Sequence, residues 1–259
     1  NDGHGHFTRV PVTGPRFLKE DGSPVTTDPD FFTLAARFYD VNGDGAPDLY
    51  VCNDFEDPDQ FWINDGKGNF RLTPALSVRE TSNTCMSVDF ADVNRDGHVD
   101  FFTTDMLSPT LAARQRQVPT HTPLPKKVGL TTDRGQWMRN TLQLSRGDGT
   151  WAQVADFAGV AATDWAWGSA VLDGDLDGYE DLLVVNGHRW DIRDADTFEH
   201  IRNSVPRIEW NREQGAFPRL ATRTVAPPHP GDRRLAALQR DGRVGVEEPT
   251  PPVTTPACL

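Results

Sequence analysis

A nine-residue pattern rich in aspartate occurs three times in the chain, and it constrains the fold more than any other feature of the sequence. The copies are DVNGDGAPD (residues 40–48), DVNRDGHVD (92–100) and DGDLDGYED (173–181), hereafter the first, second and third loop. Each has oxygen-bearing side chains at positions 1, 3, 5 and 9 and glycine at position 6. Because glycine adopts a positive φ at little cost, it suits a sharp reversal of the chain.

The three loops have the chemistry of calcium sites. Calcium takes roughly six to eight oxygen ligands from side chains, backbone carbonyls and water, and magnesium is less suited because it keeps several of its waters. We therefore expect about three calcium ions per chain. The predicted ligands are Asp40, Asn42, Asp44, the Ala46 carbonyl and Asp48 in the first loop, Asp92, Asn94, Asp96, the His98 carbonyl and Asp100 in the second, and Asp173, Asp175, Asp177, the Tyr179 carbonyl and Asp181 in the third.

Two other interpretations of the loops compete with calcium binding. Asp, Asn and Gly are common turn residues, but the same spacing in three copies favours an ion. An EF-hand needs a glutamate at position 12 between two helices, whereas position 12 is Val51, Thr103 or Val184. The flanking runs are short and rich in β-branched and aromatic residues, which is typical of strands. Each loop is therefore expected to join two strands, in one antiparallel hairpin.

A second repeated signal alternates with the aspartate loops. NDGHGHF (residues 1–7), NDGKGNF (64–70), RGDGTW (146–151) and the more divergent WNREQGAF (210–217) read as hairpin turns between strands. Two hairpins per repeat give a four-stranded antiparallel unit, which at this length indicates a β-propeller blade. A solenoid has shorter repeats, and a sandwich has no reason to repeat a nonapeptide. We expect an all-β chain of about three and a half blades, an incomplete ring whose remaining blades are missing from this chain.

Residues 1–220 are assigned to this partial propeller, with insertions at about 16–30 and 106–136. Residues 16–30 show no clear strand pattern, and 106–136 contain LAARQRQ, which is compatible with a turn or two of helix. The second insertion is also the basic part of the chain: it contains Arg114, Arg116, Lys126, Lys127 and Arg134. It is either a solvated surface loop or a loop that contacts a ligand. Residues 221–259 are rich in proline and lack hydrophobic periodicity, so a disordered tail is expected.

Aromatic and polar residues near the third loop allow two interpretations each. Trp165 and Trp167 alternate in sequence and should share one face of a strand, where they either pack between blades or form a stacking surface for a sugar. His188 and Trp190 follow the strand after the third loop. A polar residue recurs five positions after each closing aspartate, where it caps a turn or lines a central funnel. These residues are Asn53, Asp105 and Asn186.

Charge and cysteine content exclude some classes of protein. The formal net charge is −12, which argues against a nucleic-acid partner because phosphates would be repelled. No run of apolar residues approaches the ~18 needed to span a membrane. Cys52, Cys85 and Cys258 match no zinc-site spacing. The first two are expected to be small buried thiols near strands, with a disulfide between them as the alternative.

The combination of aspartate loops and NDG hairpins resembles the FG-GAP or VCBS repeats of integrin-α-like β-propellers. The sequence most resembles bacterial VCBS-repeat proteins of the ASPIC and UnbV group, which are similar to cartilage acidic protein. The segments that show this resemblance are SVDFADVNRDGHVDFFTTDML (87–107), RNTLQLSRGDGTW (139–151) and AGVAATDWAWGSAVLDGDLDGYEDLLVVNGH (158–188). The resemblance covers about residues 1–200 and implies an exported, calcium-stabilised propeller used in adhesion or ligand binding. A C-terminal ASPIC region is not recognisable.

Three functional hypotheses follow. The first is a secreted, periplasmic or cell-surface binding or adhesion module without catalytic activity, whose partner is an unknown protein or carbohydrate. The second is the propeller portion of a secreted polysaccharide lyase or hydrolase; no nucleophile elbow, HExxH or catalytic cysteine pattern supports it. The third is a purely architectural part of a larger polypeptide.

Overall fold

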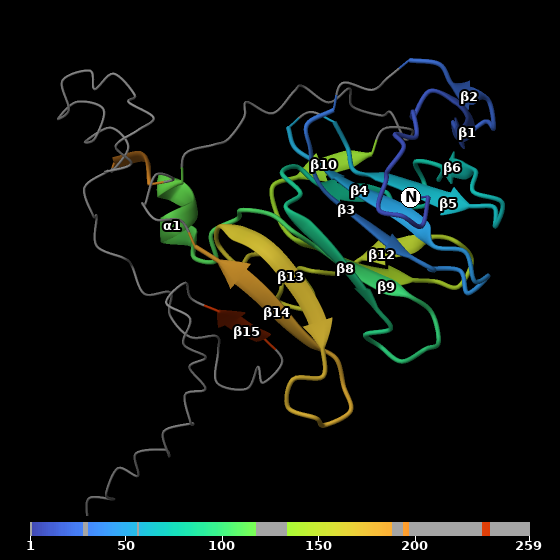
Figure 1. Cartoon of the computed structure of the whole chain (residues 1–259). Coiled ribbons are helices and arrows are strands. Elements are labelled where there is room, and N and C mark those ends of the chain that lie inside the picture. Colours follow the sequence, from blue (N-terminus) through green and yellow to red (C-terminus); the bar gives the residue numbers. More distant parts are fainter. Residues whose placement is uncertain are drawn as a thin grey trace, which may run out of the picture.

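The computed structural model describes residues 2–27, 31–55, 57–117, 134–187, 194–196 and 235–238. In these ranges the chain is mostly β with almost no helix (Figure 1). The first strands are β1 (Gly14–Leu18), β2 (Pro24–Val25), β3 (Thr33–Tyr39), β4 (Asp48–Asn53), β5 (Gln60–Asn64), β6 (Phe70–Leu72) and β7 (Glu80–Ser82). They are followed by β8 (Ser87–Ala91), β9 (Asp100–Thr104), helix α1 (Leu111–Arg116), β10 (Gly135–Trp137), β11 (Thr141–Ser145), β12 (Trp151–Gln153), β13 (Ala166–Leu172), β14 (Asp181–Asn186) and β15 (Leu235–Leu238).

The first sheet has the order β2-β1-β6-β5-β4-β3. Its strands β3 to β6 form an antiparallel meander in chain order, as the repeat predicts. The insertion at residues 16–30 differs from the prediction, because β1 and β2 lie in and around it. Strand β1 pairs in parallel with β6, through Phe17 and Phe70, and in antiparallel with β2. Strands β1 and β2 are short, and their sequences show no alternation of polar and apolar residues. Pairing with β6 and with each other holds them in the sheet.

The second sheet is a four-stranded antiparallel meander in the order β12-β11-β9-β8. The third sheet contains the β13–β14 hairpin and β15, which pairs in parallel with β14. Strand β15 lies within the segment predicted to be a disordered tail, so the prediction differs from the structure at Leu235–Leu238. Strands β7 and β10 form a small parallel sheet of their own. The hairpin predicted at residues 210–217 lies outside the described residues. The turn at residues 1–7 is not a hairpin in the described part of the chain, because the first strand after it begins at Gly14.

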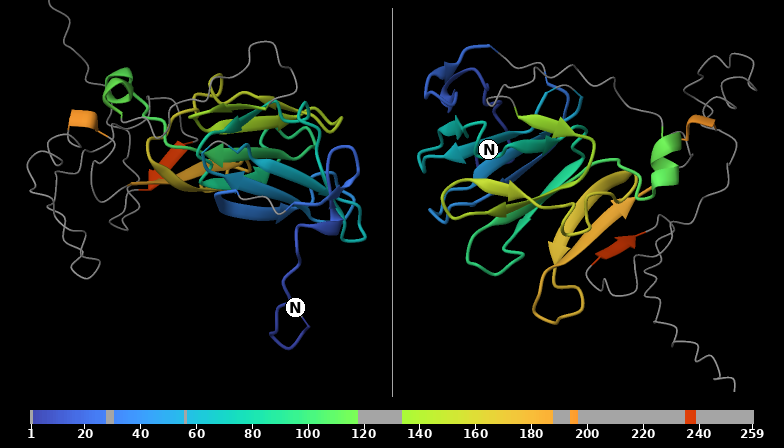
Figure 2. Two further views of the ribbon diagram at one scale, coloured as in Figure 1. Left: turned by 90° about the horizontal axis from the view of Figure 1, so that it is seen from above. Right: turned by 180° about the vertical axis from the view of Figure 1, so that it is seen from behind.

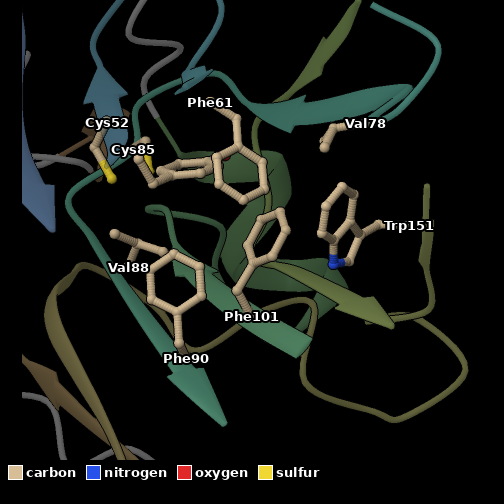
Figure 3. Close-up of a cluster of buried hydrophobic side chains, with 9 residues drawn as sticks. Cys52, Phe61, Val78, Cys85, Val88, Phe90, Phe101 and Trp151 are labelled. Carbon is tan, nitrogen blue, oxygen red and sulfur yellow. The ribbon is translucent and has the colours of Figure 1, made fainter. Parts of the chain in front are cut away.

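The hydrophobic core lies between neighbouring sheets. Between the first and second sheets it consists of Tyr50, Cys52, Phe61, Val78, Cys85, Val88, Phe90, Phe101 and Trp151 (Figure 3). The rings of Phe61 and Trp151 are 5.1 Å apart, and those of Tyr50 and Phe101 are 5.0 Å apart. A second cluster, which includes Phe102, Ala166 and Val184, lies between the second and third sheets. The second sheet is therefore packed between the other two, as the views in Figure 2 also show.

The first strands of the three hairpins, β3, β8 and β13, are neighbours in space (Figure 1). Asp89, in the middle of β8, connects them. Its Oδ2 accepts a hydrogen bond from the Val171 amide (2.9 Å), and its Oδ1 lies 2.9 Å from the guanidinium of Arg37 on β3. The carboxylate is almost fully buried, so it ties strands from all three sheets together.

The insertion at 106–136 contains α1, the short helix that LAARQRQ predicts; Thr110 caps it by accepting from the Ala113 amide. Its described arginines all bind protein groups, while Arg114 and Arg116 are also exposed to solvent. Arg134 donates to the carbonyls of Asp59 (3.0 Å) and Thr73 (2.7 Å). Arg114 donates to the Ser108 carbonyl, and Arg116 forms an ion pair with Asp194. Lys126 and Lys127 lie outside the described residues.

No helix in the described part of the chain is long and apolar enough to cross a membrane.

Candidate functional site

The three aspartate loops occupy equivalent places in the fold. They connect β3 to β4, β8 to β9 and β13 to β14, and each pair of strands is antiparallel. The prediction of three antiparallel hairpins is therefore confirmed. The loops project from the same end of the packed sheets (Figures 1 and 2). The glycine turns at 64–70 and 146–151 also join antiparallel strands, β5 to β6 and β11 to β12.

A common set of hydrogen bonds gives the three loops one shape. In each loop the glycine amide at position 6 donates to the carboxylate at position 1, at 2.8, 2.8 and 2.9 Å. The amide at position 7 donates to the aspartate at position 5, at 2.8, 2.9 and 2.8 Å. The amide at position 5 donates to the side-chain oxygen at position 3, at 3.0, 3.1 and 3.2 Å. These bonds turn the side chains at positions 1, 3 and 5 inward.

Two residues in each loop adopt left-handed backbone conformations. Position 6 has φ of 84°, 85° and 86°, which explains the glycine. Position 4 is also left-handed, as Gly43 (74°), Arg95 (60°) and Leu176 (61°). A side chain at a positive φ costs free energy, so Arg95 and Leu176 show that the loop shape is imposed by the rest of the motif. This position was not predicted from the sequence; Gly43 in the first copy is its signal.

The third loop brings three carboxylates together. Oxygen atoms of Asp173, Asp175 and Asp177 all lie within 4.8 Å of one another. Oδ1 of Asp173 is buried and has no hydrogen-bond donor. A buried, unsatisfied carboxylate oxygen costs free energy unless a cation or donor meets it. The donor set therefore fits a divalent cation that prefers oxygen ligands.

The first two loops hold fewer charges at the same positions because position 3 is asparagine. The amides of Asn42 and Asn94 donate to Asp44 and Asp96, each at 2.9 Å. Asp40 accepts from the backbone amides of Gly43, Asp44 and Gly45, and Asp92 accepts from those of Asp96 and Gly97. The amides at positions 5, 6 and 7 donate to the side chains at positions 3, 1 and 5 in these loops as in the third. The position-7 carbonyls of Ala46, His98 and Tyr179 stay predicted ligands.

The closing aspartates at position 9 have a structural role that the spacing of the loops does not predict. Oδ2 of Asp48 accepts from the Val41 amide (3.0 Å), and Oδ1 accepts from the Asn64 amide (2.8 Å). Asp100 repeats this with Val93 (3.1 Å) and Ser145 (2.7 Å). Each carboxylate thus links an aspartate loop to the glycine turn of the same sheet.

The third closing aspartate, Asp181, accepts from the Gly174 amide at 3.0 Å. Burial raises the pKa values of Asp48 and Asp100, although the amide hydrogen bonds oppose this effect. Their assignment as metal ligands stays a prediction, since each oxygen has a further lone pair.

Side chains also connect the loops to their neighbours. The guanidinium of Arg95 in the second loop lies 4.1 Å from the ring centre of Tyr179 in the third. The imidazole of His98 lies against Gly147, where an added Cβ would be 2.5 Å from Nε2. A groove of about 840 Å³ separates the first loop from the second and is lined by Asp40, Asn42 and His98.

The polar residues five positions after each closing aspartate cap turns, one of the two roles considered for them. Asp105 accepts from Ser82 Oγ (2.6 Å) and from the amides of Asn83 and Thr84. Asn53 donates to the Pro58 carbonyl and accepts from Thr33 Oγ1, each at 2.9 Å. Asn186 donates to the Thr163 carbonyl.

The tryptophans predicted to share a face do so: the ring centres of Trp165 and Trp167 are 5.9 Å apart, with the planes 31° from parallel. The indole N–H of Trp167 donates to the Gly187 carbonyl (2.6 Å), while 46% of the residue is exposed. Their role as a sugar-stacking surface stays a prediction. His188 and Trp190 lie outside the described residues.

Comparison with known families gives one match. Residues 40–103 match the family model of the FG-GAP-like repeat. The matched range runs from the first loop, through the glycine turn at 64–70, to β9 beyond the second loop. No curated protein sequence matches the chain. The repeat is of a kind found in extracellular binding and adhesion proteins, and the match agrees with the mostly β structure.

Proposed function

We propose that the chain is a calcium-stabilised extracellular binding or adhesion module, secreted, periplasmic or at the cell surface, whose three aspartate loops each hold one ion. The observation that carries this proposal is the third loop. Its three carboxylates lie within 4.8 Å of one another, and a buried oxygen of Asp173 lacks a donor. An oxygen-ligating cation of charge +2 would satisfy that oxygen and offset the repulsion among the carboxylates.

The arrangement of the sheets supports a β-propeller as the scaffold. The first and second sheets each contain a four-stranded antiparallel meander that begins with an aspartate hairpin. Strands β3, β8 and β13 are neighbours, as the innermost strands of adjacent blades would be. The third loop would then belong to a third blade, and the ring would need further blades to close.

In this proposal the ion has a structural task. Bound by residues at positions 1, 3 and 5, it would fix the loop that joins two strands and would hold one wall of the groove between the first and second loops. Binding to the folded state alone stabilises it by about 2.7 kcal/mol per ion at a hundredfold excess over Kd. The ligand of the module is a protein or carbohydrate whose identity is open.

Thermal unfolding tests the proposal. The midpoint should rise when calcium replaces a chelator, and magnesium at equal concentration should have a smaller effect. Asp173→Asn should reduce the calcium-dependent part of the shift, because it removes a charge while keeping an acceptor for the Gly178 amide. Asp65→Asn is the matched control: Asp65 is an exposed aspartate that accepts from the Lys67 amide in a glycine turn.

An unfolding midpoint that is the same in calcium and in chelator would contradict the proposal. So would an equal loss of calcium response in Asp65→Asn and Asp173→Asn.

A further inference from the structure

Two cysteines meet in the core between the first and second sheets. Cys52 lies on β4, and Cys85 lies between β7 and β8; both are fully buried. Both belong to the same hydrophobic cluster, and the close-up shows their side chains next to each other (Figure 3). They are free thiols in this structure.

The backbone holds the two cysteines in place. The Cys85 amide donates to the carbonyl of Asn53, the residue after Cys52, at 3.1 Å. The next residue, Met86, donates to the Thr104 carbonyl of β9 at 2.9 Å, so Cys85 is fixed to both sheets. The Cys85 thiol donates to the Ser87 carbonyl at 3.7 Å. Two buried cysteines that lie side by side on segments joined by a backbone hydrogen bond have the kind of placement in which a disulfide forms.

We propose that Cys52 and Cys85 form a disulfide that joins the first sheet to the second when the protein folds under oxidising conditions. This inference is independent of calcium binding, because neither cysteine is part of an aspartate loop. Disulfides form and persist in compartments outside the cytosol. Cys258 is left as the third, unpaired cysteine.

The oxidant is a small disulfide such as oxidised glutathione. One cysteine thiolate attacks a sulfur of the oxidant, whose S–S bond breaks and releases one thiol. The other cysteine thiolate then attacks the mixed disulfide, which forms the Cys52–Cys85 bond and releases the second thiol. Two protein thiols are oxidised, and the oxidant is reduced to two thiols.

The order of events follows from burial. Both side chains are inaccessible once the two sheets have packed, and burial also raises the pKa values of both thiols, which disfavours the reactive thiolate. The exchange therefore takes place during folding, before the core closes.

The bond would close a loop that contains β5, β6 and β7. In the chain-entropy account, a cross-link over a loop of this length raises the equilibrium constant for folding by about 500-fold. The effect acts through the unfolded chain, so it should appear in unfolding measurements without any change in the folded contacts.

The test refolds the full chain with a mixture of oxidised and reduced glutathione. After removal of the oxidant, the protein is unfolded in guanidinium and treated with a thiol-alkylating reagent, and its peptides are mapped by mass spectrometry. The proposal expects a peptide pair linked through Cys52 and Cys85, an intact mass about 2 Da lower than that of the reduced chain, and alkylation of Cys258 alone. The Cys258→Ser variant, treated in the same way, should give the same linked pair.

Alkylation of both Cys52 and Cys85 after oxidative refolding would overturn the proposal, as would a bond from either of them to Cys258. A second readout needs no variant at the pair. Guanidinium unfolding of the oxidised chain should have a higher midpoint than that of the chain kept in reductant, and coincident curves would count against a stabilising cross-link.

Discussion

The aspartates of the loops divide into two groups by what their carboxylates contact. Those at positions 1, 3 and 5 accept hydrogen bonds from within their own loop and keep lone pairs that point inward. Those at position 9 bind amides of both their own loop and, in the first two sheets, the adjacent glycine turn. The sequence shows only that all four positions carry oxygen, so it predicts one role where the structure shows two.

The position-9 role can be tested without metal. Asp100→Ala removes a buried carboxylate and leaves the partly buried amides of Val93 and Ser145 without their acceptor, so it should lower the free energy of unfolding by about 2–4 kcal/mol in chelator. Asp96→Ala removes an exposed aspartate of the same loop and should cost less than about 1 kcal/mol. Chemical denaturation of both variants measures the difference, and equal losses would contradict the structural role of Asp100.

Asp59 provides a prediction about pH. Its carboxylate is fully buried and accepts from the Tyr50 hydroxyl and the Asn53 amide, each at 2.9 Å. Burial raises its pKa from 3.8 to about 7 despite these hydrogen bonds. Since the folded pKa lies above the unfolded one, the protonated group contributes stability that is complete below about pH 4 and is lost as the pH rises through about 7.

The Asp59→Asn variant should therefore show a weaker fall in unfolding free energy between pH 4 and 8 than the natural chain, by up to about 4 kcal/mol. Asp105, Cys52, Cys85 and Arg134 surround the site in both proteins, so their contributions largely cancel in the comparison. The measurement is denaturant unfolding across this pH range in chelator. Parallel pH profiles would show that Asp59 does not titrate in this window.

At the scale of secondary structure, the repeated patterns predicted the hairpins well and their surroundings poorly. The three aspartate hairpins and two glycine hairpins were predictable because turn chemistry and strand composition are local properties. Strands β1, β2, β7, β10 and β15 were not predicted. Four of them pair in parallel with segments far away in the chain, and β2 pairs only with β1. A short strand that is held by a distant partner need not alternate polar and apolar residues, so its sequence does not reveal it.

The site was predicted to a similar extent. Spacing identified the residues of each loop, but it did not reveal the left-handed residue at position 4 or the link from position 9 to the glycine turn. The arginines of the second insertion show the same limit. Composition suggested a basic surface, whereas Arg134 is half-buried and donates to the carbonyl of Asp59, which precedes β5, and to that of Thr73, which follows β6.

The contact between hairpins through Asp89 leads to a further prediction. Asp89→Ala removes the acceptor of the Val171 amide and the partner of Arg37, both in the buried region between three sheets. We expect it to lower the free energy of unfolding by about 2–4 kcal/mol. Asp156→Ala is the matched control, because Asp156 pairs with Arg139 but its side chain is 63% exposed. Its loss should be below about 1 kcal/mol, and an equal effect in denaturant unfolding would contradict the linking role of Asp89.

At the scale of the whole molecule, packing between sheets carries most of the core. Aromatic side chains from β4, β5, β8, β9 and β12 meet between the first and second sheets, whereas strand β3 exposes Leu34, Phe38 and Tyr39. The sheets pack face to face, and the three aspartate loops lie at one end of them. The proposed ions would therefore stiffen the turns rather than the core. Calcium removal should therefore loosen the loop end of the molecule before the sheets separate.

The central claim is that the three aspartate loops bind calcium, and counting bound ions tests it most directly. Equilibrium dialysis of the chain against calcium should give about three ions per molecule, about two for Asp173→Asn, and almost none for the combined Asp40→Asn, Asp92→Asn and Asp173→Asn variant. The Asp65→Asn control should retain the full number. A natural chain that binds no calcium, or a combined variant that binds as many ions as the natural chain, would contradict the claim.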